Sequence, residues 1–132
     1  MPNHLHCILY FPDEHFDLGK IIGNAKRFMA YEIVRRLKVM NLDNTLTILK
    51  NGLTDRKIKK GQKHRVFEDS FDAKPIFSES FFFQKPDYIH YNPVQDKWKL
   101  VEDFFEYEHS SASFYETGKA FHFEPTHYNE MG

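Results

Sequence analysis

The chain has 132 residues and a mass of 15.8 kDa, a length that suits one domain and is short for two. Its 41% hydrophobic and 28% charged residues exclude an intrinsically disordered chain, and its single cysteine excludes an internal disulfide. No run approaches the roughly 18 apolar residues of a membrane helix, and the first residues do not form a signal peptide. The net charge of −1 argues against a surface that coats nucleic acid everywhere, and leaves room for a local basic patch.

The first two expected elements are a strand and a long helix. His4 to Phe11 mixes β-branched, aromatic and apolar residues and ends at the turn signal Pro12-Asp13, which predicts a largely buried strand. Residues 17–40 then carry apolar side chains at helical spacing, with basic side chains on much of the opposite side. Asp17 is placed to cap this helix at its N-terminus.

A basic stretch follows the helix. Residues 46–54 could form a short helix or a strand closed by Gly52, and the segment after them is a polar loop. Lysine and arginine side chains there could neutralise several phosphates, and two more on the long helix extend this surface. A solvated loop that only aids solubility fits the sequence equally well. The candidate DNA-binding residues are Lys26, Arg27, Arg56, Lys57, Lys59, Lys60, Lys63 and Arg65.

The second half of the chain predicts another strand and another helix. Residues 64–77 alternate in places and predict a strand that ends near Pro75. Residues 78–92 have helical content, interrupted at Pro86 and ended by Pro93. Beyond Trp98 the chain is rich in aromatic residues and acidic, and it shows no clear period. The charge of −1 thus averages a basic loop against an acidic C-terminal half.

His4 and His6 are candidate metal ligands. On a strand, residues two apart point to the same face, so both imidazoles can reach one point in space. One surface histidine and one hydrogen-bonded histidine would be an equally common outcome. Cys7, on the opposite face, is expected to be a small buried core residue.

Tyr88 and Asn92 form the second candidate pair. If residues 87–92 are a helical turn, the two side chains are at positions i and i+4 and share a face. The hydroxyl of tyrosine has a pKa near 10, so a nearby cation is needed to make it a nucleophile, and the oxygen of Asn92 could be a ligand of that cation. A core tyrosine beside a helix-end asparagine is the commoner arrangement. His90 points away from Tyr88 and is expected to be structural or to face the substrate.

These motifs together resemble a known family. MPNHLHCILYF resembles the histidine-hydrophobic-histidine strand of the single-tyrosine HUH transposases, and YIHYNPV followed by SSASFY resembles the branch of REP-associated tyrosine transposases. The resemblance implies an α+β fold across residues 1–132, a ferredoxin-like antiparallel sheet with helices packed on one face, with a less regular tail from about residue 110. In the family a strand, a helix and usually another strand precede this point, so the resemblance implies a domain that is incomplete at its N-terminus.

The resemblance also assigns roles. Tyr88 matches the nucleophile, His4 and His6 the paired metal ligands, and Asn92 the third ligand, with Mg²⁺ or Mn²⁺ as the cofactor. The family cleaves single-stranded DNA, often near a hairpin, through a 5′-phosphotyrosine intermediate. The expected partner is therefore single-stranded or hairpin DNA and not a membrane, the expected location is the cytoplasm at the nucleoid, and a homodimer is one assembly that the family allows.

Two alternatives from other classes remain open at this point. One is a non-catalytic DNA-binding relic of a mobile element, which keeps the basic loop without holding a metal. The other is a metal-binding protein unrelated to DNA, which uses His4 and His6 with another of the scattered histidines.

Overall fold

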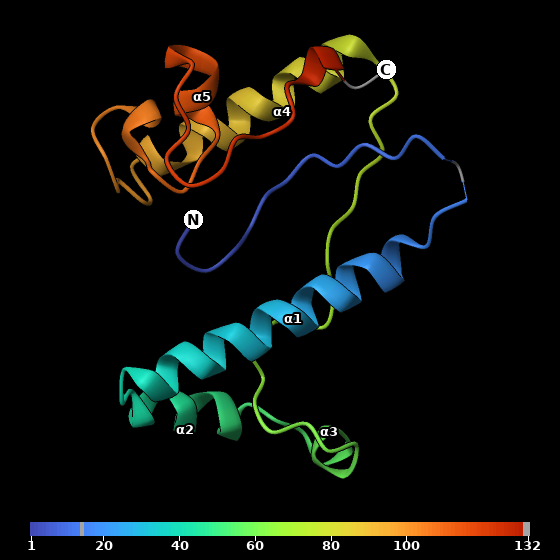
Figure 1. Ribbon diagram of the computed structural model, residues 1–132, viewed down its shortest axis with the longest axis vertical. Helices are drawn as coiled ribbons and strands as arrows, with labels where there is room; N and C mark the ends of the chain where they lie inside the picture. Colours follow the sequence, from blue (N-terminus) through green and yellow to red (C-terminus); the bar gives the residue numbers. More distant parts are fainter. Residues whose placement is uncertain (14, 131–132) are drawn as a thin grey trace. The chain divides into compact units, whose positions relative to one another are not determined.

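The computed structural model describes residues 1–13 and 15–130, and all regular secondary structure in these ranges is helical (Figure 1). Helices make up about half of the chain. The α-helices are α1 (Leu18–Val39), α2 (Asp43–Asn51), α3 (Asp55–Lys59), α4 (Glu79–Tyr91) and α5 (Ala112–Thr117). Short 3-10 helices cover η1 (Asn92–Val94), η2 (Phe104–Glu106) and η3 (Tyr128–Glu130). None of these helices is both long and apolar enough to cross a bilayer.

The expected α+β, ferredoxin-like fold is wrong, because the described residues contain no strand and no sheet. Residues 4–11 and 64–77 were both expected to be strands, and neither pairs with a neighbour in the described chain. A strand is stabilised by hydrogen bonds to a second strand, so a local pattern that favours extended backbone does not create a sheet alone. Leu5 is 72% exposed and Cys7 is exposed, so the expected burial of this segment and of Cys7 is also wrong.

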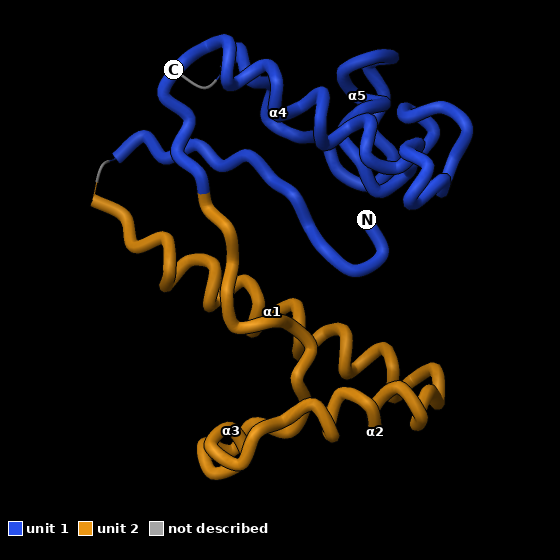
Figure 2. Tube along the Cα trace, turned by 180° about the vertical axis from the view of Figure 1, so that it is seen from behind, with its two compact units in different colours: residues 1–14, 74–132 blue, residues 15–73 orange. Residues whose placement is uncertain are grey.

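Contacts between Cα atoms divide the chain into two compact units (Figure 2). Unit 1 comprises residues 1–14 and 74–132, and unit 2 comprises residues 15–73. The charges are divided in the same way. Unit 2 has 13 Lys and Arg against 7 Asp and Glu, a net charge of +6, whereas unit 1 has 5 against 12, a net charge of −7. The overall charge of −1 therefore hides two strongly and oppositely charged parts.

Unit 2 is built on the long helix that the sequence predicts. Asp17 caps α1 as expected, because its Oδ1 accepts a hydrogen bond of 2.9 Å from the backbone N–H of Lys20. Helix and strand were both open for residues 46–54, and residues 46–51 of this stretch belong to α2 (Asp43–Asn51), which packs against α1. The chain returns to α2 after α3, where the backbone N–H of Arg65 donates to the carbonyl oxygen of Leu49 over 2.8 Å.

Unit 1 is built on α4, whose boundaries follow local signals. Ser78 caps it by accepting a hydrogen bond from the backbone N–H of Phe81. The helix runs through Pro86 without the expected interruption, and it ends before Pro93, as expected. The fully or nearly fully buried residues of the described chain all lie where the end of α4 and η1 meet α5. They are His90, Asn92, Pro93, Ala112 and Ser113.

Ala112 has an exposed fraction of 0%, so this small core leaves no room for a larger side chain there. We expect Ala112→Leu to lower the free energy of unfolding by about 1–3 kcal/mol through overpacking. Ala25→Leu, on the exposed side of α1, should change it by less than about 0.5 kcal/mol. Urea unfolding followed by circular dichroism measures both values, and equal effects would contradict a core at Ala112.

Candidate functional site

Three residues that the sequence proposes for catalysis, His4, His6 and Tyr88, lie together in unit 1. The ring centroids of His4 and His6 are 4.8 Å apart, and those of His6 and Tyr88 are 5.8 Å apart. Alternation along an extended chain places the two imidazoles on one side even without a sheet. Trp98 closes the cluster, with its ring centroid 5.5 Å from that of His4. An N-terminal segment and the helix α4 thus meet through side chains.

The histidines present lone pairs that could bind a cation. His4 Nδ1 lies 2.7 Å from Oδ1 of Asn3, and a hydrogen bond to that carbonyl oxygen needs the proton on Nδ1, which leaves the lone pair on Nε2. Partial burial lowers the pKa of His6, and the nearby His4 and the N-terminal amine lower it further. Both effects favour the neutral imidazole, the form that binds metals. The contact between Asn3 and His4 is one that the sequence reasoning missed.

Asn92 has a different environment from the two histidines. Asn92 is the first residue of η1 and is 4% exposed. The Nδ2 atom of its side chain has no hydrogen-bond partner in the described chain. Tyr88, one turn earlier, is 53% exposed. The ring centroids of His4 and His6 are 4.8 Å apart, which makes the two imidazoles candidates for a shared divalent cation. A zinc ion, for example, would need both nitrogen atoms about 2.0–2.1 Å away. The unsatisfied amide of Asn92 shows unused hydrogen-bonding capacity one turn from Tyr88, and no hydrogen bond joins it to either histidine.

His90 was expected either to be structural or to face the substrate, and its contacts are those of a structural residue. It is 8% exposed, and its Nε2 lies 2.9 Å from Oγ of Ser111. Burial lowers the pKa of His90 against the opposing effect of Asp87 and Glu116. The motif segments YIHYNPV and SSASFY are therefore joined by a hydrogen bond between their own residues.

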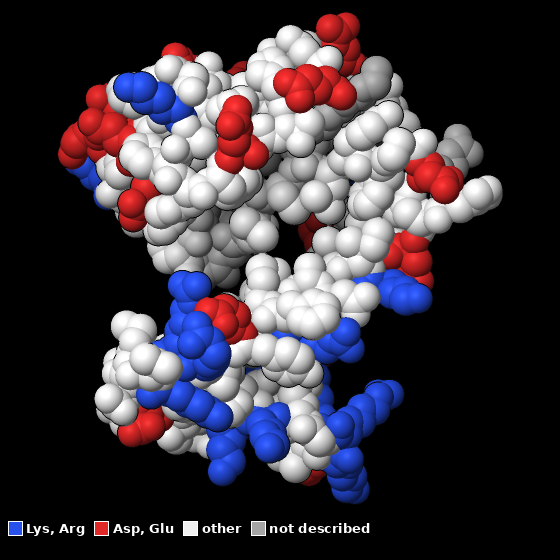
Figure 3. Space-filling view, viewed as in Figure 1, with Lys and Arg blue, Asp and Glu red and all other residues white. Residues whose placement is uncertain are grey.

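Lysine and arginine outnumber acidic residues in unit 2, which contains every candidate DNA-binding residue; Figure 3 shows the basic side chains in blue. Several of them hold the unit together. Lys26 Nζ donates 2.8 Å hydrogen bonds to the carbonyl oxygens of Glu68 and Ser70, and ion pairs join Lys57 to Asp69 and Arg65 to Glu68. These three cations anchor the segment after α3.

The remaining candidates are available for a ligand. Arg27 lies over the ring of Phe28 at 5.0 Å. Four others are exposed and make no ion pair within residues 1–13 and 15–130: Arg56, Lys59, Lys60 and Lys63. Sequence alone does not distinguish these four from Lys57 and Arg65, because the ion pairs depend on where the chain brings Glu68 and Asp69 back to α3.

A second cluster in unit 1 has no counterpart in the sequence-based prediction. Glu108, His109 and His122 place their ligand atoms within 4.8 Å of one another, beside a pocket of about 150 Å³. His109 is adjacent to Glu108 in sequence, but His122 lies beyond α5, so no spacing pattern marks the trio. High histidine content was the one available signal.

Comparisons with other proteins identify no relative: no family model matches the chain, and neither the curated proteins nor the solved structures include a match.

The Lys57–Asp69 pair has a measurable consequence, because the hydrogen bond from Lys57 is the main cause that lowers the pKa of Asp69. In Lys57→Met we expect this pKa to rise toward its ordinary value of 3.8, as measured by NMR titration of the carboxyl carbon. The folded pKa lies below the unfolded one, so the stabilisation is present above pH 3.8 and is lost as pH falls through the folded pKa. Lys59→Met is the matched control and should leave Asp69 unchanged. An unchanged Asp69 in Lys57→Met would contradict the pair.

Proposed function

We propose that this protein nicks and rejoins single-stranded DNA in the manner of the single-tyrosine HUH transposases, with Tyr88 as the nucleophile. The observation that carries the proposal is the cluster of His4, His6 and Tyr88. These residues come from two segments that are distant in sequence, MPNHLH and YIHYNPV. The ring centroids of His4 and His6 are 4.8 Å apart, and those of His6 and Tyr88 are 5.8 Å apart. The contact agrees with the roles that the resemblance assigns to them.

The chemistry of the proposed step is a phosphoryl transfer without loss of bond energy. The Oη atom of Tyr88 attacks the phosphorus, the bond from phosphorus to the 3′ oxygen breaks, and the phenol loses its proton as the 3′ oxygen gains one. The free 3′ hydroxyl later attacks the phosphotyrosine and restores Tyr88. A bound Mg²⁺ or Mn²⁺ would neutralise charge on a non-bridging oxygen and favour the phenolate. His4 and His6 would hold this ion, with Asn92 as the proposed third ligand.

Tyr88 is suited to meet a large substrate. It is 53% exposed on a helix whose following residues are buried, so its hydroxyl is accessible while its backbone is held. His6 lies against its ring at an interplanar angle of 80° and limits its orientation. These features favour a polymeric phosphodiester over a substrate that must enter an enclosed pocket.

Unit 2 supplies the charge for DNA binding. Its net charge of +6 and its exposed cations provide attraction for phosphates that does not depend on sequence. The proposed partner is accordingly single-stranded or hairpin DNA, with a homodimer as one possible assembly. The proposed location is the cytoplasm, at the nucleoid.

One observation favours a second function, that of a non-catalytic DNA-binding protein derived from a mobile element. Asn92 is 4% exposed, whereas His4 and His6 are exposed, so the three ligands named by the resemblance have unlike environments. A chain that cannot assemble all three would retain the basic surface of unit 2 without cleaving DNA.

Adduct formation tests the nucleophile. With Mn²⁺ or Mg²⁺ and a labelled single-stranded hairpin oligonucleotide, we expect a covalent protein–DNA adduct on a denaturing gel. Tyr88→Phe removes the attacking oxygen, so it should abolish the adduct and leave binding intact. Tyr91→Phe is the matched control on the same helix: Tyr91 is 49% exposed and contacts Phe104, and its loss should not prevent the adduct.

The other outcomes of this experiment are distinct. An adduct that persists in Tyr88→Phe and disappears in Tyr91→Phe would transfer the nucleophile to Tyr91. Binding without an adduct in the unchanged protein, with either metal, would support the non-catalytic alternative. The double variant H4Q/H6Q should lose the adduct and keep binding if the histidines hold the catalytic cation.

The salt dependence of binding tests the basic surface. Lys59→Gln with Lys60→Gln removes two exposed cations that have no ion pair in the described chain. If both contact phosphates, the slope of log K against log salt for single-stranded DNA should become shallower by about 1.4. Lys20→Gln with Lys38→Gln lowers the charge of unit 2 equally and should change the slope less. Equal changes would show general attraction without a contact at Lys59 and Lys60.

A further inference from the structure

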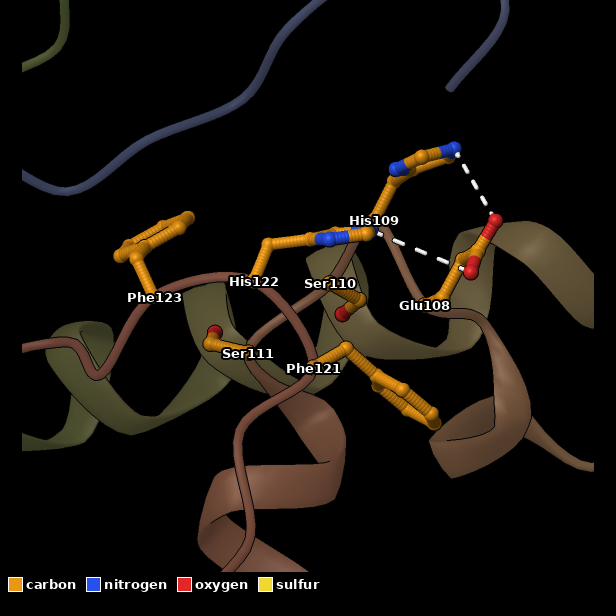
Figure 4. A pocket seen from close by; sticks show the side chains of 7 residues that line it. All are labelled: Glu108, His109, Ser110, Ser111, Phe121, His122 and Phe123. Carbon is orange, nitrogen blue, oxygen red and sulfur yellow. Dashed lines mark ion pairs between the residues drawn. The ribbon is translucent and has the colours of Figure 1, made fainter.

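We propose that Glu108, His109 and His122 form a zinc-binding site, separate from the cation site of His4 and His6. Figure 4 shows the carboxylate of Glu108 directed at both imidazoles. His109 Nε2 is 3.5 Å from Oε1 of Glu108, and His122 Nε2 is 3.9 Å from Oε2. All three side chains are exposed, so they can turn without disturbing a core.

The distances already approach those of a coordination sphere. Ligand atoms 2.0–2.1 Å from a tetrahedral zinc ion are about 3.3 Å from one another. The contact of 3.5 Å between His109 and Glu108 nearly meets this value, and the largest separation in the trio, 4.8 Å, requires a movement of about 1.5 Å by exposed side chains. The two imidazole planes are stacked, inclined by only 17° with centroids 5.2 Å apart, so at least one of these exposed rings must rotate for both in-plane lone pairs to meet one ion.

The ligand types narrow the choice of metal. Two imidazoles and a carboxylate are a donor set that favours zinc over Mg²⁺ or Ca²⁺, which prefer oxygen ligands throughout. The adjoining pocket of about 150 Å³ has space for the water that would complete the sphere, since one water occupies about 30 Å³ in the liquid. Ser110 and Ser111 line the same pocket and offer hydroxyl groups to such a water.

The position in the chain gives this site a structural consequence. His109 precedes α5 and His122 follows it, 13 residues later, so one ion would close a loop that contains the whole helix. Ser111, which is hydrogen-bonded to His90 on α4, lies inside that loop. Zinc would therefore restrain residues 109–122, which are joined to α4, the helix of Tyr88, through Ser111. It would also stabilise the folded state, because the unfolded chain holds no preformed site.

Zinc titration in the H4Q/H6Q background isolates this site, because the other candidate histidine pair is then absent. We expect one Zn²⁺ to bind per chain and to raise the melting temperature. His122→Gln or Glu108→Gln in that background should weaken zinc binding at least about tenfold. His64→Gln, a histidine of unit 2, is the control and should leave affinity unchanged.

A second readout reports the ligands themselves. Co²⁺ in place of Zn²⁺ should give visible absorption typical of tetrahedral coordination, and this signal should be lost in His122→Gln. Circular dichroism verifies that each variant remains folded. If the H4Q/H6Q protein binds no zinc, or binds it equally well after His122→Gln, the trio is an ordinary ion-pair cluster and the proposal is wrong. Neither result depends on whether Tyr88 forms an adduct with DNA.

Discussion

The hydrogen bond between His90 and Ser111 is the contact on which the arrangement of unit 1 depends. It joins α4 to the start of α5, and every buried residue of the described chain lies within three positions of one of its ends. The bond is part-buried, and separating it is costly at His90, which is 8% exposed and would lose its partner with little access to water. Tyr88 is two residues from His90, so it points to another side of the helix. The bond therefore holds the helix on one side, while Tyr88 remains 53% exposed on another.

The two halves of the proposed catalytic site are held by forces of different size. Tyr88 is on a helix with a buried end, whereas His4 and His6 are on an exposed segment with no strand pairing in the described residues. Their contacts are between rings, and aromatic pairs contribute about 0.5–1.5 kcal/mol each. Metal coordination is several times stronger. A cation shared by the two imidazoles would therefore be the main interaction that orders the N-terminal half of the site.

Sequence reasoning succeeded where the signal was local. Asp17 predicted the start of α1 and Pro93 the end of α4, because a cap and a proline act on the residues next to them. It failed for residues 4–11, because a composition that favours extended backbone is stabilised as a strand only by a distant partner. The same distinction holds for function. The HxH spacing placed His4 beside His6, but nothing in the sequence placed His122 against Glu108 across α5, or Lys57 against Asp69.

The division of charge bears on how the proposed sites would act together. Unit 1 carries the proposed nucleophile and a net charge of −7, which repels a phosphodiester, while unit 2 attracts it. One divalent ion at His4 and His6 and one at Glu108, His109 and His122 would change the charge of unit 1 from −7 to −3. This reduces the repulsion at long range, while the ion beside Tyr88 also acts at the phosphate itself. Because each site would then contribute to DNA affinity through charge, zinc at the second site should strengthen DNA binding even if it never contacts the strand.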